Sequence, residues 1–167
     1  MRRPIVLVAL GALLLVAVVV PGAGATKGTD FNAPLSAAQE VADVNAPGAG
    51  GSARFWVEGN VLHYEVTVRH LTGPATQAHI HGPADRGVNA GINIWLCGTG
   101  TTQPLAGPVG TPTCSTATDG VLVTGAVTVT TEQLAMLDAG LGYANVHTAL
   151  HAPGEVRGQV LPVGSDK

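Results

Sequence analysis

Hydrophobic and polar positions alternate along much of the chain, and this alternation predicts β-strands. Two alternating stretches, residues 52–57 and 61–68, flank a short turn that contains Gly59, which is the pattern of a β-hairpin. Further strands are expected over residues 77–81, 91–97, 120–129, 142–148 and 155–161, each bounded by Gly, Pro or Asn. The pattern therefore predicts an all-β fold, either an antiparallel β-sandwich or a Greek-key barrel.

One short helix is expected between the strands at residues 120–129 and 142–148. Thr130 and Gln133 have the spacing of a capping box, and apolar residues follow at positions 134, 136 and 137. Gly140 is placed to end this helix. Residues 45–51, which are rich in glycine, are expected to form a loop.

The N-terminal segment has the pattern of a secretory signal peptide. Arg2 and Arg3 precede an apolar run over residues 5–20, and Pro21 and small residues ending at Ala25 supply a cleavage pattern. The alternative is a membrane anchor, but this run is shorter than the roughly 18 to 20 residues that a spanning helix needs. We therefore expect residues 1–25 to be removed, leaving an extracytoplasmic chain without a stable membrane span. Residues 26–167 are expected to form one domain with its core at about residues 31–162.

Charge and motif content exclude several classes of function. Without Arg2 and Arg3, six basic side chains face eleven acidic ones, a formal charge of −5, so we expect no binding of nucleic acid. The chain has neither a G-x-S-x-G elbow nor a phosphate-binding loop, and its carboxylates are scattered. We assign no catalytic residue and do not expect an enzyme.

Cys97 and Cys114 are the only cysteines of the chain. In an exported protein, oxidising surroundings favour a disulfide between them over free thiols. The alternative of a redox-active pair is disfavoured because such pairs are usually adjacent, as in C-x-x-C.

Three histidines form a candidate metal site. Side chains two apart on a strand share a face, so His79 and His81 point the same way. If His147 lies on a neighbouring strand, the three imidazoles would suit copper or zinc. His63 could be a fourth ligand only if its strand lies beside that of His79. The alternative is that these histidines bind loop carbonyls and hold strand ends in register.

Glu155 and Arg157 are also two apart on a predicted strand and should share a face. They could pair with each other, or the guanidinium fork could bind loop backbone. In both cases their role is structural, and the alternative is that they face an anion.

The order of several short tracts along the chain, and their residues, resemble the CHRD (chordin-type) domain of secreted and cell-surface proteins. The tracts are Leu-Ser-Ala-Ala-Gln-Glu-Val at 35–41, Ala-His-Ile-His-Gly-Pro at 78–83, Asn-Val-His-Thr at 145–148 after Tyr143, and Gly-Glu-Val-Arg-Gly-Gln at 154–159. The resemblance implies a secreted bacterial CHRD protein that acts as an extracellular binding or structural module. It names no particular protein partner.

A looser likeness to copper,zinc superoxide dismutases, which are secreted β-barrels with an H-x-H strand, suggests a second function. On that likeness His79, His81 and His147 would hold copper, and Arg157 would sit at the mouth of the site. The protein would then be a histidine-based copper or zinc protein with a redox or metal-carrying role. The chain lacks the family's zinc loop and a clear bridging histidine, so dismutase activity itself is not expected.

Overall fold

Residues 29–100 and 107–164 are described by the computed structural model, and within them eight antiparallel strands form one sheet. The order of strands across this sheet is β5-β4-β7-β8-β1-β2-β3-β6. The strands are β1 (Asp30–Ser36), β2 (Gly50–Glu58), β3 (Val61–Arg69), β4 (Ala75–His81), β5 (Ile92–Gly98), β6 (Gly120–Thr128), β7 (Gly142–Thr148) and β8 (Val156–Pro162). The helical elements are a short 3-10 turn, η1 (Ala37–Gln39), and the helix α1 (Thr131–Asp138). The prediction of an antiparallel all-β fold with one short helix is confirmed.

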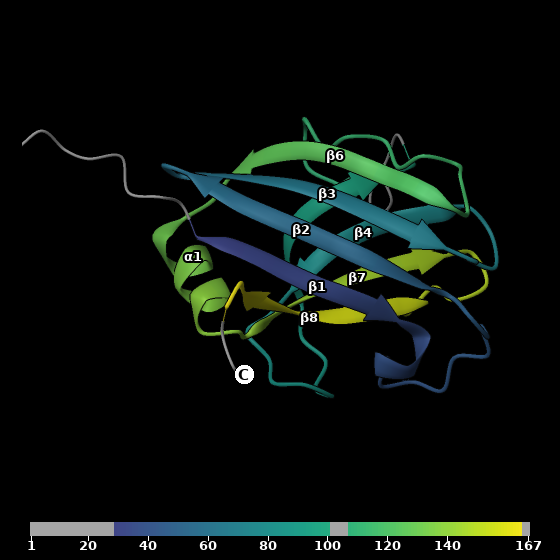
Figure 1. Ribbon diagram of the computed structural model, residues 1–167. Helices are drawn as coiled ribbons and strands as arrows, with labels where there is room; N and C mark the ends of the chain where they lie inside the picture. Colours follow the sequence, from purple (N-terminus) through teal and green to yellow (C-terminus); the bar gives the residue numbers. More distant parts are fainter. Residues whose placement is uncertain (1–28, 101–106, 165–167) are drawn as a thin grey trace, which may run out of the picture.

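The sheet curls so that its two halves face each other across an apolar core. Figure 1 shows β1, β2, β3 and β6 in front, with β4, β7 and β8 behind them and α1 at one end. Both halves contribute buried residues to a single cluster, among them Phe55 and Leu62 from one half and Ile80 and Val146 from the other. The two edge strands, β5 and β6, approach each other where the sheet would close into a barrel. Near this gap, the hydroxyl of Tyr64 on β3 donates to the carbonyl of Leu96 on β5 at 2.9 Å. The barrel is thus nearly closed.

The local predictions are confirmed at the hairpin and at the helix. Glu58 pairs with Val61, which leaves Gly59 and Asn60 as a two-residue turn, and Gly59 has a φ of 64°. At the start of α1, the Thr130 hydroxyl accepts from the Gln133 amide while the Gln133 side chain accepts from the Thr130 amide. This is the predicted capping box.

The structure differs from the sequence expectations at β1 and at the loop before β2, and it does not describe the predicted signal peptide. Strand β1 was not predicted, although Phe31, Ala33 and Leu35 alternate as its buried positions. The expected loop at residues 45–51 ends earlier, because β2 already begins at Gly50. The predicted signal peptide, residues 1–25, lies outside the described residues. Among those described, no helix has the length and apolar character needed to cross a membrane.

Candidate metal centre

Strands β4, β7 and β8 are covered on both faces. One face carries the apolar residues of the core, such as Ala78, Ile80 and Val160. The residues between them point to the opposite, outer face, because side chains alternate along a strand. This outer face holds a layer of largely buried polar side chains: His79, His81, Tyr143, Asn145, His147, Arg157 and Gln159.

A loop, residues 82–91 between β4 and β5, is fastened over this outer face by side chains of the layer. Arg157 donates to the Val88 carbonyl at 2.7 Å and to Asn89 Oδ1 at 3.1 Å. Gln159 donates to the Ala84 carbonyl at 2.9 Å, and the Tyr143 hydroxyl accepts from the Ala90 amide at 3.0 Å. We call this segment the 82–91 loop. Its attachment explains why polar side chains on an outer face are buried.

The three predicted histidines meet on this outer face, where His81 contacts the 82–91 loop at Ala90 and His147 contacts the loop after β7 at Ala152. Antiparallel pairing of β4 with β7 brings His147 beside His79 and His81, and one ring nitrogen from each lies within 4.8 Å of the other two. His79 Nδ1 is 3.2 Å from His147 Nε2. Two nitrogens bound tetrahedrally to one zinc ion at about 2.0 to 2.1 Å would be about 3.3 Å apart. The observed spacing therefore fits a shared metal ion as well as a direct hydrogen bond.

Backbone carbonyls determine which nitrogens are free. His81 Nδ1 lies 3.0 Å from the Ala90 carbonyl, and His147 Nδ1 lies 2.9 Å from the Ala152 carbonyl. Because a carbonyl can only accept, each of these Nδ1 atoms carries the proton and each Nε2 keeps its lone pair. The Nε2 atoms of His79 and His81 are buried and have no hydrogen-bond partner. His79 Nδ1 and His147 Nε2 are thus paired with each other, and the Nε2 atoms of His79 and His81 are the nitrogens left unsatisfied.

Burial keeps these imidazoles neutral. Burial, with smaller effects of His147 and His81 in the same direction, lowers the pKa of His79 to about 2. Burial likewise lowers the pKa of His147 to about 4, although the bond to the Ala152 carbonyl raises it. The pKa of His81 is also lowered by burial, and Arg157 acts in the same direction against the Ala90 carbonyl. Neutral imidazoles have the lone pairs that a metal ion requires.

Aromatic side chains surround the group. The ring of Trp95 meets His79 edge-on, with centroids 4.2 Å apart. Tyr143 stacks on His81 with 5.0 Å between centroids and 7° between planes. On the far side of Tyr143, the Arg157 Cζ lies 3.4 Å from the ring centroid. His81, Tyr143 and Arg157 thus form a stack that we call the ligand stack.

His63 does not join the group, which corrects the expectation that it could be a fourth ligand. Its strand, β3, lies between β2 and β6 rather than beside β4. The ring of His63 instead stacks on Trp56 at 5.2 Å and lies 3.6 Å from a Glu58 carboxylate oxygen.

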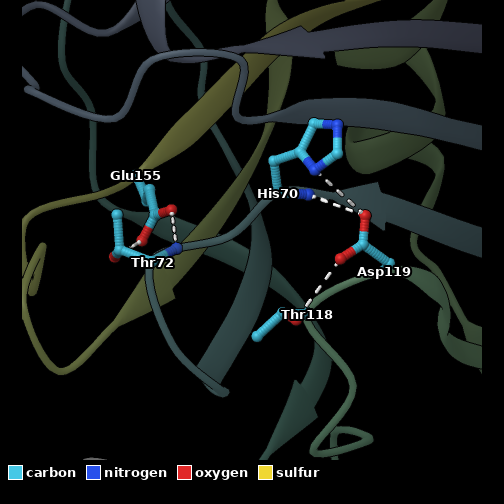
Figure 2. A network of polar contacts seen from close by, with 5 residues as sticks. All are labelled: His70, Thr72, Thr118, Asp119 and Glu155. Carbon is cyan, nitrogen blue, oxygen red and sulfur yellow. Dashed lines mark hydrogen bonds and ion pairs between the residues drawn. The ribbon is translucent and has the colours of Figure 1, made fainter.

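Glu155 and Arg157 bind different segments. Figure 2 shows the Glu155 carboxylate directed at Thr72, where it accepts from the backbone amide at 2.7 Å and from the hydroxyl at 2.6 Å. Figure 2 also shows the neighbouring His70, whose backbone amide donates to the Asp119 carboxylate at 3.0 Å. Arg157 is only 2% exposed, and its guanidinium lies against the ring of Tyr143. It also lines an open surface pocket with Glu40, Arg86 and Gln159.

Cys97 and Cys114 are joined, with an S–S distance of 2.10 Å, and both are buried. The bond ties the end of β5 to the segment that precedes β6. Backbone bonds support the same junction, since the Gly98 amide donates to the Pro112 carbonyl and the Cys114 amide to the Gly98 carbonyl.

Glu40 is a member of the site region that sequence reasoning missed. Its carboxylate accepts from Asn145 Nδ2 at 2.8 Å, and burial raises its pKa to about 7 although Asn145 and Arg157 lower it. Gly154 allows this contact, because its φ is +136° and a Cβ there would meet both Asn145 and Glu40. The polar alternation at positions 143, 145 and 147 was the sequence signal for a polar face, but nothing in it pointed to Glu40.

Comparison with known proteins identifies a domain family. The sequence model of the CHRD domain matches residues 31–160, which include every strand except the outermost residues of β1 and β8. No curated protein and no solved structure matches the chain.

Proposed function

The chain belongs to the CHRD-domain family, and on this premise we propose that it is an exported binding module whose ligand is a copper or zinc ion. His79, His81 and His147 would hold the ion. The observation that carries the proposal is the convergence of three imidazoles, with one ring nitrogen of each within 4.8 Å of the other two and the Nε2 of His81 buried without a partner. Imidazole nitrogens are common ligands of both metals.

A purely structural role accounts for only part of this arrangement. The Nδ1 atoms of His81 and His147 do bind loop carbonyls, as a strut would. The remaining nitrogens of His79 and His81 would then stay buried and unsatisfied, and each such group costs about 1 to 3 kcal/mol. A cation bound by the Nε2 of His81 would remove that cost for His81. In metal sites, the carbonyl contacts of the far nitrogen are also what orients a histidine ligand.

Export is the second part of the proposal. It is supported by the basic and then apolar N-terminal segment and by the disulfide between Cys97 and Cys114. With three protein ligands, a bound zinc ion would have one coordination position open, as in catalytic zinc centres. Bound copper would supply one-electron chemistry there, and bound zinc would supply Lewis acidity.

The test is metal loading of the whole protein, produced through the export route of its host and purified without a histidine tag. Elemental analysis after incubation with copper or zinc and removal of excess ion should give one ion per chain. His79→Gln and His147→Gln should lose the ion, while His63→Gln, a matched replacement outside the group, should keep it. Circular dichroism would check that each variant retains its β-structure.

Two results would overturn the proposal. One is a wild-type protein that retains neither ion against a chelator of micromolar affinity. The other is a folded His79→Gln variant that retains the ion as the wild type does. The N-terminal sequence of the purified protein tests export separately, because it should begin at Thr26.

A further inference from the structure

We propose that the three-histidine site selects monovalent copper over divalent ions, and that Arg157 is the residue that enforces the selection. This inference rests on the proposed function and names its ligand. It is argued from the charge of the ligands, from the ligand stack and from the number of ligands available.

The ligand group provides no negative charge. Among the described residues it consists of His79, His81 and His147, with no carboxylate or thiolate. Two carboxyl groups nearby lie outside the ligand group: the buried Glu155 binds Thr72, and the half-buried Glu40 binds Asn145 and faces the charge of Arg157. The cost of burying an ion rises with the square of its charge, so a divalent ion is penalised far more than a monovalent one.

The ligand stack contains one fixed charge, the positive guanidinium of Arg157. The Arg157 guanidinium lies against the ring of Tyr143, and the ring of His81 stacks parallel to the same tyrosine. Bonds to Val88 and Asn89 hold the guanidinium in this position. Its repulsion of a divalent ion is twice its repulsion of a monovalent ion at the same place. Arg157 therefore discriminates by charge without touching the metal.

The number of ligands points the same way. Structural zinc sites are almost always tetrahedral with four protein ligands, and zinc sites with three protein ligands take a water as the fourth. The fourth candidate, His63, lies on β3 away from the group. Monovalent copper can be held by three nitrogens alone, so at this site it needs no fourth ligand, whereas zinc does.

The experiment compares affinities of the same exported protein for two ions. Binding of Cu(I) would be measured without oxygen against bathocuproine disulfonate, and binding of Zn(II) against 4-(2-pyridylazo)resorcinol. We expect Cu(I) to bind at least about a hundredfold more tightly. Equal or tighter binding of Zn(II) would overturn the selectivity and leave the proposed function intact, whereas binding of neither ion would overturn the proposed function itself.

Variants at position 157 test the role of the arginine. Arg157→Met removes the charge at similar length and should narrow the preference for Cu(I) over Zn(II) by on the order of tenfold. It should also lower the midpoint potential of bound copper, because the divalent state is relieved of repulsion. Arg157→Lys keeps the charge and should keep most of the preference. Asn89→Ala loosens the 82–91 loop without changing charge, so it controls for loss of packing. If Arg157→Met and Asn89→Ala shift the preference equally, Arg157 does not select by charge.

Discussion

Replacing His79 by glutamine should weaken the dependence of stability on acid in the metal-free protein. Burial holds the pKa of His79 at about 2 in the folded chain, whereas an unfolded histidine has a pKa of about 6.5. Between these values the unfolded state binds a proton that the folded state does not. The folded state therefore has its full stability above pH 6.5 and loses stability as the pH falls below that value.

The size of this effect follows from linkage. Each pH unit below the unfolded pKa costs about 1.4 kcal/mol per histidine, so lowering the pH from 7 to 5 should cost about 2 kcal/mol through His79. Glu40 acts in the opposite sense, because its folded pKa is raised to about 7 and its cost of burial falls as the pH drops. That contribution is common to both proteins and cancels in the comparison.

The assay is urea unfolding at pH 7 and at pH 5 with a metal chelator present. Wild-type protein should lose about 2 kcal/mol more than His79→Gln between the two conditions. His63→Gln serves as a control for the replacement itself, since its ring lies on a different strand beside Trp56. An equal loss in wild type and in His79→Gln would show that His79 is not held neutral by burial.

Three further predictions concern stability at neutral pH. Replacing Cys97 and Cys114 together by serine should lower the free energy of unfolding by about 3 kcal/mol, because the bond closes a loop of 17 residues; equal urea midpoints would contradict this. Thr130→Ala should cost about 1 kcal/mol in the same assay through loss of the capping box, and a Ser replacement should restore most of it. Glu155→Gln should cost about 2 kcal/mol because a buried charged acceptor is lost, and hydrogen exchange of the Thr72 amide should quicken; unaltered exchange would count against that bond.

The elements that were predictable from sequence are those with local signals. The hairpin at Gly59 and the capping box at Thr130 each depend on a few adjacent residues. Strand β1 was missed because Pro34 interrupts its pattern and has no amide hydrogen to give to a ladder. In the structure, pairing of β1 with β8 is indeed interrupted between Asn32 and Ser36.

The candidate site was predictable only in part. The spacing of His79 and His81 placed them on one face, but the position of His147 depends on β4 pairing with β7, across more than sixty residues of chain. Sequence also gave no indication that the outer face would be buried, because the cover comes from loop contacts such as Arg157 with Val88. The exclusion of His63 likewise followed only from the order of the strands.

The fastening of the 82–91 loop has a consequence for the rate at which an ion could exchange. An ion could reach His79 from this side only if the loop lifts, which breaks the bonds of Arg157, Gln159 and Tyr143 together. Opening events that break several bonds at once are slow and rare. We therefore expect both loading of the folded protein and removal of the ion by a chelator to be slow, so binding measurements must run long enough to reach equilibrium.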